Sequence, residues 1–359
     1  MTSFETQTAV VGVSGYAGAE LARLLTHHPR LHGCPPVFFG REEDDSVENS
    51  ASAGVALTEL HPQLADNNGS ASLRVEPFRW AALRERGISV VFLATPHEQS
   101  RAWAPDLLAH GVRVIDLSGA WRMQQQENRA VYRFEDVDAS VATRIQQQAV
   151  YGMPELHREA IKNAQIVANP GCYATSIILG LAPLVRAGLV DVEHGVICDA
   201  KSGVSGAGKA PSAKTHFMYA ADNLSAYSVF GHRHTGEMLE QLELKPQQIT
   251  FTPHLLPIPR GIFSTLYITL RGKKSSQEIA DCYRSFYSGS PMVRFHGERL
   301  PQIQHSVRTN YCDIGFALAE DGKRLIVVSC LDNLLKGAAG QAVQNMNLLL
   351  GWPEQEGLL

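Results

Sequence analysis

The sequence predicts an α/β fold in which a Rossmann-type doubly wound parallel sheet is joined to a second α+β domain with a mixed or antiparallel sheet. An apolar run at 8–13 leads through a glycine-rich turn into a helical pattern. Further apolar runs alternate with helical stretches in the first half, which is typical of a parallel sheet. After residue 169, one helix is followed by strand-like runs at spacings typical of a mixed or antiparallel sheet with helices on one face.

The first half shows its elements as short apolar runs. A helix at 19–25 follows the first strand, and the next strands are predicted at 36–40, 90–94 and 112–117. Their spacing fits strand–helix–strand units. Two polar stretches, 42–49 and 66–72, are interpreted as surface loops.

The second half begins with an apolar helix at 175–184. Predicted strands follow at 195–200, 248–252, 264–270, 312–318 and 324–330. A last helix, 333–350, is rich in small residues, so we expect it to pack closely, back on the first domain.

Composition limits the class of protein. The chain has 359 residues, 44% of them hydrophobic and 19% charged, which is typical of a globular protein. Its net charge of −4 offers no electrostatic reason to bind nucleic acid or an anionic membrane, so an anionic substrate must be bound by local cations. No apolar run approaches the roughly 20 residues of a membrane helix, and the start lacks a signal-peptide pattern. We therefore expect a cytoplasmic protein whose six cysteines are free thiols.

A glycine-rich turn with the spacing GxxGxxG lies directly between the first strand and the first helix. Glycines permit a tight turn there, and the free N–H groups at the helix start attract a pyrophosphate. The pattern predicts a dinucleotide site, and a glycine turn without a ligand is the alternative. The residues concerned are Gly12, Ser14, Gly15, Tyr16, Ala17 and Gly18.

The end of the second predicted strand bears on which dinucleotide binds. An acidic residue there would hydrogen-bond a ribose 2′-hydroxyl, whereas a cation would bind a 2′-phosphate. Gly40 is followed by Arg41, with Glu42 and Glu43 behind it. We interpret Arg41 as the phosphate partner, which favours NADP, and a solvated charge run is the alternative.

Cys172 differs from the other cysteines in its position. Pro170 and Gly171 make a turn before a helical run, so Cys172 is expected in or just before the first helical turn. Free N–H groups and the helix dipole there stabilise a thiolate and lower the thiol pKa. A thiolate attacks activated carbonyl groups, so this position predicts covalent acyl transfer, with a structural cysteine as the alternative.

A second polar stretch, GHRHTGE at 231–237, places His232 and His234 close together before a helix. An imidazole titrates near neutral pH and can transfer protons. Zinc binding is a competing interpretation of His-x-His, but no third ligand stands at a suitable spacing, so no metal site is predicted. A surface loop with incidental histidines is the remaining alternative.

Two further features are candidates for binding an anion. The glycine-rich segment 202–209, which begins with Ser202 and Gly203, follows a predicted strand and could present backbone donors. Ala210 stands where a Walker A motif needs serine or threonine, so a nucleotide triphosphatase is not supported. Arg101 and Arg122 are candidate clamps for a carboxylate or phosphate, because a guanidinium offers a bidentate fork to either.

With these segments in order, the chain resembles the N-acetyl-gamma-glutamyl-phosphate reductase family, which is allied to aspartate-semialdehyde dehydrogenase. The resemblance runs from Val11 to Gly351. The segments that carry it are GVSGYAGAEL, ATPHEQS, VIDLSGAWR, YGMPEL, ANPGCYAT, KSGVSGAGK, FGHRHTGE, FTPHLLPIPRGIFST and SCLDNLLKGAAGQAVQNMNLLLG.

The resemblance implies roles for single residues. Cys172 would be the nucleophile and His232 the acid/base, with His234 as the alternative. Besides the glycine turn, the implied cofactor residues are Thr95, Pro96, Ser202, Gly203 and Asn333, and the implied substrate contacts are Ser118 and Arg122. LSGAWR departs from the family's LSADFR-like pattern at Gly119, Ala120 and Trp121, but it keeps the arginine.

The implied activity is NADPH-dependent reductive dephosphorylation of N-acetyl-L-glutamyl 5-phosphate to N-acetyl-L-glutamate 5-semialdehyde, through a cysteine thioester, in arginine biosynthesis. A dinucleotide-binding domain would comprise 1–169 and 333–359, and 170–332 would serve catalysis, substrate binding and homo-oligomerisation as a dimer or tetramer. The alternatives are the same chemistry on N-acetyl-aminoadipyl or aspartyl phosphate, a Cys–His hydrolase, or a non-catalytic dinucleotide sensor.

Overall fold

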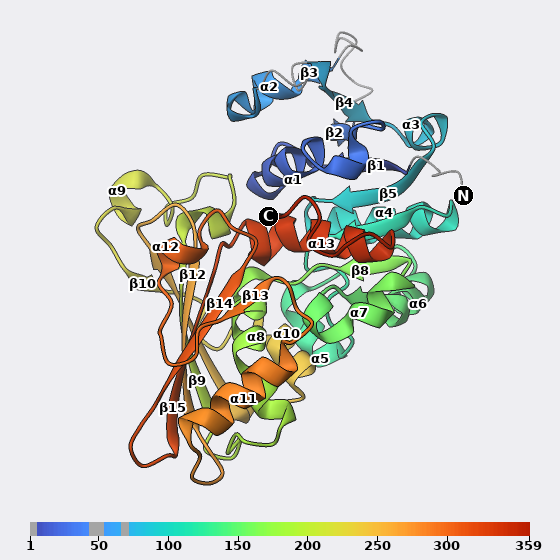
Figure 1. Cartoon of the computed structure of the whole chain (residues 1–359). Helices are drawn as coiled ribbons and strands as arrows, with labels where there is room; N and C mark the ends of the chain where they lie inside the picture. The colour runs from blue at the N-terminus through green and yellow to red at the C-terminus, as the bar shows by residue number, and fades with distance from the viewer. Residues whose placement is uncertain (1–5, 43–53, 66–71) are drawn as a thin grey trace.

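The structure is a computed structural model that describes residues 6–42, 54–65 and 72–359. It contains two sheets with helices packed beside them (Figure 1). The predicted fold class is therefore confirmed. The loops predicted at 42–49 and 66–72 lie, except for their end residues, outside the described residues. None of the described helices is long and apolar enough to cross a membrane.

The first sheet has eight strands in the order β3-β4-β2-β1-β5-β6-β8-β7, and only the β3–β4 pair is antiparallel. The strand order reverses between β1 and β5, and in such sheets ligands bind outside the carboxyl ends of the strands at this point. The strands are β1 (Gln7–Val11), β2 (Val37–Glu42), β3 (Val55–Ala56), β4 (Arg74–Phe78), β5 (Ile88–Leu93), β6 (Arg113–Asp116), β7 (Val150–Tyr151) and β8 (Ile166–Ala168).

Helices connect these strands and cover the sheet. The α-helices are α1 (Tyr16–Thr26), α2 (Leu57–Leu60), α3 (Trp80–Glu85), α4 (His97–Ala109), α5 (Gln126–Arg129), α6 (Ala139–Gln148) and α7 (Pro154–Lys162). Short 3-10 turns occur at η1 (Pro29–Leu31), η2 (Pro62–Leu64) and η4 (Ala130–Tyr132). Sequence patterns missed β3, β4, β7 and β8, because Glu76 and Pro77 interrupt the apolar run of β4 and the other three strands have only two or three residues.

The second sheet is mixed, with seven strands in the order β10-β11-β9-β12-β15-β14-β13. On one side it packs against α8 and α11, and this side faces the first sheet (Figure 1). The strands are β9 (Val196–Gly203), β10 (Ser225–Ala226), β11 (Ile249–Leu256), β12 (Ile262–Thr269), β13 (Val293–Phe295), β14 (Cys312–Leu318) and β15 (Arg324–Leu331). The helices are α8 (Cys172–Arg186), α9 (Phe217–Ala220), α10 (Thr235–Leu242), α11 (Ser276–Phe286) and α12 (Ile303–Ser306), with 3-10 turns η5 (Val204–Ala207) and η6 (Pro246–Gln248).

The end of the chain returns to the first domain, as the small residues of 333–350 predict. It does so through a π-helix, η7 (Leu335–Ala339), followed by α13 (Gly340–Leu349). All ten residues of α13 are buried, and the helix contacts α1 and α7, while η7 contacts α1 and α8. This segment thus lies between the helices of both domains, next to the start of α8.

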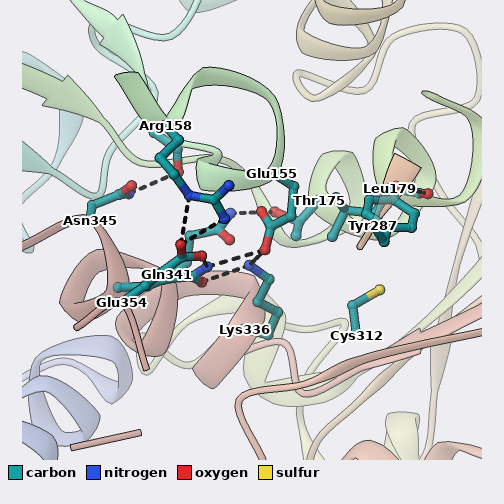
Figure 2. Close-up of polar contacts among 12 residues, drawn as sticks. Glu155, Arg158, Thr175, Leu179, Tyr287, Cys312, Lys336, Gln341, Asn345 and Glu354 are labelled. Atoms are coloured by element: carbon teal, nitrogen blue, oxygen red, sulfur yellow. Dashed lines mark hydrogen bonds and ion pairs between the residues drawn. The ribbon is translucent and has the colours of Figure 1, made fainter. Parts of the chain in front are cut away.

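A buried polar network holds the returning segment in place (Figure 2). The Lys336 ammonium, in η7, donates to Glu155 Oε1 of α7 at 2.7 Å and to Gln344 Oε1 of α13 at 2.7 Å. The side chains of Lys336 and Glu155 are both fully buried. Glu354, which accepts from Gln344 and pairs with Arg158, extends the network toward the carboxyl end.

This network depends on paired charges. Although burial acts to raise it, the pKa of Glu155 is lowered overall by the Lys336 ammonium and by hydrogen bonds. A buried charge without a partner is strongly unfavourable, so each member holds the other in position. The ion pair therefore joins η7 to α7, two elements 181 residues apart in sequence.

Removing one charge from this pair should destabilise the protein. We expect Lys336→Met to lower the free energy of unfolding by about 3–5 kcal/mol, because Glu155 then stays buried without its cation. Urea denaturation followed by circular dichroism measures this change. The matched control is Lys162→Met, which breaks the exposed Lys162–Glu159 pair and should cost less than about 1 kcal/mol. Equal losses for the two variants would contradict a special role of the buried pair.

Candidate active site

The glycine turn between β1 and α1 is too tightly packed for side chains at two positions. Gly12 has φ +89°, and a Cβ on it would lie 2.5 Å from the carbonyl oxygen of Ala94, which follows β5. A Cβ on Gly18 would lie 2.4 Å from the Gly12 carbonyl oxygen. These approaches bring the start of α1 close to the carboxyl ends of β1 and β5. Such a cradle fits the pyrophosphate of a dinucleotide.

A cavity of about 350 Å³ opens at this turn and reaches Cys172. It joins residues of the glycine turn, the segments after β5 and β6, the start of α8 and the segment before η7. The predicted site residues that it brings together are Gly15, Tyr16, Ala17, Gly18, Thr95, Pro96, Ser118, Arg122, Cys172 and Asn333. Lys209, which the sequence analysis did not select, also lines it, and its ammonium donates to the Ser14 carbonyl oxygen at 3.3 Å.

Besides Arg41, four predicted cofactor residues are absent from the lining of this cavity. Gly12 packs against the Ala94 carbonyl oxygen, and Ser14 contributes the carbonyl oxygen that Lys209 contacts. Ser202 lines a second cavity, described below. Gly203 is packed against the backbone of the 258–260 segment, where a Cβ would lie 2.7 Å from Arg260 N.

The structure also places two other predicted cofactor residues, Arg41 and Asn333. Arg41 lies in β2, beside β1, but its side chain is outside the described residues. Asn333 has both ends of its amide occupied: Oδ1 accepts from Gly261 N at 2.7 Å, and Nδ2 donates to Ser205 Oγ at 2.9 Å. It therefore holds the glycine-rich segment against the cavity.

Cys172 is the first residue of α8, with Gly171 as its N-cap, as the Pro-Gly turn predicts. Its Cα and Cβ lie against Gly337 of η7, where a Cβ would be only 2.7 Å from Cys172 Cβ. Cys172 is partly exposed where it lines the two cavities, but the protein packed around its sulfur desolvates it and raises the pKa of the thiol to about 11. The Tyr173 N–H and the charges of Arg122 and Arg233 oppose this without overcoming it. The expectation of a lowered thiol pKa is therefore wrong for the ligand-free protein.

The two histidines lie beside the thiol, but not equally close to its turn. The His234 ring packs on Gly171, where a Cβ would lie 2.5 Å from its Nε2, and it lines both cavities together with Cys172. His232 lines only the second cavity, and its Nδ1 accepts from His234 N at 3.1 Å. Burial, with Arg233 beside it, lowers the pKa of His232 to about 4, and burial also lowers the pKa of His234 well below its ordinary value. Both rings are thus neutral near pH 7 and able to accept a proton.

The second cavity, of about 440 Å³, shares Cys172, His97, Gly206, Arg233 and His234 with the first. Its walls come mainly from the segment 212–233, which includes Tyr227, and from Tyr173 of α8. The remaining lining residues are Val131, Tyr132, Tyr173, Ser202, Ala207, Ser212, Lys214, Thr215, Ser225, Tyr227, Ser228, Gly231, His232 and Leu255.

Among the described residues, the charged side chains that line the two cavities are all positive. They are Arg122, which Glu237 balances from beneath, and Arg233, Lys209 and Lys214. In a chain with a net charge of −4, this is the local concentration of cations that an anionic substrate requires.

The two arginines that the sequence analysis considered as anion clamps, Arg101 and Arg122, each pair with a carboxylate of the protein. Arg122 is buried, its Nη1 lies 3.1 Å from Glu237 Oε1, and its Nη2 donates to the Leu117 carbonyl oxygen at 2.7 Å. Arg101 pairs with Asp136 and lies over the Trp121 ring, outside both cavities. Arg233, in contrast, makes no ion pair within the described part of the chain.

Sequence reasoning missed Glu237, the last residue of the GHRHTGE stretch. Its carboxylate is fully buried and accepts from Arg122, from Tyr151 Oη at 2.8 Å and from Gly171 N at 2.9 Å. The sequence does place this glutamate in the first turn of a helix, but it gives no sign of its hydrogen-bond partners, which are 66 to 115 residues away.

The comparisons with known proteins agree with this architecture. The family models for the semialdehyde dehydrogenase NAD-binding domain and dimerisation domain match residues 7–164 and 172–333. Aspartate semialdehyde dehydrogenase II from Vibrio cholerae superimposes with a TM-score of 0.68 at 18% identity, covering 97% of this chain and 99% of that chain. The enzyme from Francisella tularensis gives 0.65 at 16% identity, over 96% and 99%. The fold and the matched models thus define a semialdehyde dehydrogenase-type protein.

Curated relatives narrow the family further. N-acetyl-gamma-glutamyl-phosphate reductase from Desulfotalea psychrophila is 44% identical over 355 residues, covering 98% of this chain and 97% of the relative. Those from Geobacillus stearothermophilus and Methanococcus maripaludis are each 41% identical with the same coverage. This chain belongs to the N-acetyl-gamma-glutamyl-phosphate reductase family.

The raised thiol pKa predicts how the ligand-free protein reacts with an alkylating agent. Because only the thiolate reacts, and a thiol with a pKa near 11 is about one part in a thousand ionised at pH 8, we expect iodoacetamide to modify Cys172 slowly at pH 8. The rate should rise steadily up to about pH 11. Mass spectrometry of the Cys172 peptide measures it, with Cys172→Ser as the blank. A plateau at pH 7 would show that the thiolate is already formed at rest.

Proposed function

We propose that this chain reduces N-acetyl-L-glutamyl 5-phosphate to N-acetyl-L-glutamate 5-semialdehyde with NADPH, releasing phosphate, as a step of arginine biosynthesis. The observation that carries the proposal is the position of Cys172, which lines both cavities at once. One cavity begins at the glycine turn and suits a dinucleotide, and the other suits the acyl substrate. Family membership supports the particular substrate.

In this mechanism the Cys172 thiol loses its proton to a neutral imidazole as its sulfur attacks the acyl carbon. The C–O bond to phosphate breaks, phosphate leaves, and the acyl group remains on Sγ as a thioester. Bound NADPH supplies the hydride that reduces this thioester. Hydride addition leaves a thiohemiacetal alkoxide on Sγ, which re-forms the carbonyl bond, breaks the C–S bond and releases the aldehyde. The expelled thiolate takes back the proton that the imidazole accepted, which restores the thiol and the neutral ring.

We propose His234, the alternative to His232 in the sequence analysis, as the proton acceptor. Its ring lies on Gly171, beside Cys172, and it lines both cavities. His232 accepts the His234 backbone N–H and packs edge-to-face on Tyr173, so it would hold this segment in place. A neutral ring is required for this role, and burial, which lowers the pKa of His234, keeps the ring neutral near pH 7.

NADP rather than NAD is the finer part of the cofactor proposal. Arg41 lies toward the carboxyl end of β2, which runs parallel to β1 beside the glycine turn. A cation at this strand end suits a ribose 2′-phosphate. Lys209, lying over Ser14, would add a second cation at the phosphates.

We further propose a cytoplasmic homo-oligomer, dimer or tetramer, in which 170–332 forms the interface and 1–169 with 333–359 binds the dinucleotide. Support comes from the face of the second sheet that exposes Ile197, Tyr267 and Ile326 on neighbouring strands. Apolar side chains side by side on an open sheet are typical of a surface that a partner covers. The matched family description names this part a dimerisation domain.

The decisive test of the function compares three acyl phosphates. We expect NADPH oxidation with N-acetylglutamyl phosphate and little with N-acetyl-aminoadipyl or aspartyl phosphate. Cys172→Ser should abolish turnover, by about 10³-fold or more, because a serine hydroxyl is not activated at this position. NADPH fluorescence titration should give an unchanged Kd for this variant. Retention of most of the rate by the serine variant would exclude the covalent mechanism.

Substitutions of Arg233 and Lys209 should affect the binding of different ligands, the acyl phosphate for Arg233 and the dinucleotide for Lys209. Arg233, at the junction of the cavities and without an ion pair in the described chain, should bind the anionic substrate, so Arg233→Gln should raise the KM for the acyl phosphate by about 10–100-fold. Lys209→Gln, in the dinucleotide cavity only, should instead raise the KM for NADPH. Steady-state kinetics with each substrate varied in turn measures both, and an unchanged acyl phosphate KM in Arg233→Gln would argue against this assignment.

A further inference from the structure

The Glu237 carboxylate joins three segments that surround the thiol. Its Oε1 accepts from Arg122 of the loop after β6, and its Oε2 accepts from Tyr151 of β7 and from Gly171, the N-cap of α8. The side chain has no exposed surface. A fully buried carboxylate with three donors, one of them charged, is held in a single place, and so are its donors.

Hydrogen bonds at both its N–H and its carbonyl oxygen, and a ring packed on its Cα, hold Gly171 in place. Its N–H donates to Glu237 at 2.9 Å, and its carbonyl oxygen accepts from Thr175 N at 2.8 Å and from Thr175 Oγ1 at 3.0 Å. The His234 ring lies against its Cα. His234 immediately precedes α10, and Glu237 lies in its first turn, so one short segment contacts Gly171 through both a ring and a carboxylate.

We propose that Glu237 is a positioning residue, which sets the place of the Cys172 thiol relative to the His234 ring by holding the Gly171 peptide and balancing the buried Arg122 charge. The proposal rests on the proposed function for its catalytic meaning. It assigns to Glu237 no contact with substrate or cofactor, because Glu237 lines neither cavity.

The charges around the sulfur make this role measurable. Arg122 and Arg233 favour the thiolate, Glu237 opposes it, and neutral His234 and His232 face the same space. Neutralising Glu237 removes the opposing charge and leaves Arg122 without a counter-ion. The thiol should then ionise at lower pH, while the Gly171 peptide loses part of its anchor, because an amide cannot accept from all three donors.

Glu237→Gln is the direct test, with Glu240→Gln as its matched control. Glu240 lies one turn along the same helix. It accepts hydrogen bonds from Gln124 N and Gln125 N rather than from Gly171. In Glu237→Gln we expect the pH profile of iodoacetamide reaction at Cys172 to move to lower pH by about one unit. We also expect kcat to fall about 10-fold or more, with the KM for NADPH unchanged. Glu240→Gln should keep the parent profile and kcat.

Several outcomes would overturn the proposal. A parent-like alkylation profile and kcat in Glu237→Gln would do so, as would equal losses in Glu240→Gln, which would indicate a general role of α10 in folding. If Glu237→Gln does not fold, Arg122→Gln/Glu237→Gln, which buries no unpaired charge, is compared with Arg122→Gln alone. A lower kcat in the double variant supports the anchoring of Gly171, and equal values refute it.

The alkylation readout uses no substrate or cofactor. A shifted profile in a protein that does not reduce acyl phosphates would therefore contradict the proposed function while leaving the role of Glu237 at the thiol intact. An unshifted profile in a protein that does reduce them would contradict the role of Glu237 while leaving the proposed function intact.

Discussion

The buried ion pair between Lys336 and Glu155 anchors the returning segment on which the arrangement of the site depends (Figure 2). It holds η7 against α7, and η7 presents Gly337 to the back of Cys172. Asn333, just before η7, ties the glycine-rich segment after β9 to the same place. One pair of opposite charges in a solvent-free interior thus anchors the returning segment that contacts both the thiol and the glycine-rich segment.

Features that depend on near neighbours could be predicted from the sequence. The glycine turn follows from a strand, a helix and the need for a positive φ at Gly12, and the place of Cys172 follows from Pro170 and Gly171. The presence of two sheets, one parallel and one mixed, followed from the spacing of apolar runs along the chain. Short or interrupted strands such as β4 and β8 gave no such run and were missed. The successful predictions thus used patterns that span only a few residues of the chain.

Features that depend on distant contacts could not be predicted. Glu237 meets Gly171 across 66 residues and Arg122 across 115, and no local pattern records either contact. For the same reason the sequence favours Arg122 as a free clamp for an anion, although its charge is balanced inside the protein. The direction of the thiol pKa was wrong because the helix start was considered alone, without the segments that bury the sulfur.

The protonated state of the Cys172 thiol has a consequence for survival of the protein under oxidative stress. Hydrogen peroxide oxidises thiolates far faster than thiols, and the products beyond the sulfenic acid are irreversible. A sulfur that remains protonated until a neighbouring base accepts its proton is a poor target for peroxide in the resting state. The same desolvation that disfavours its ionisation therefore preserves the nucleophile between turnovers.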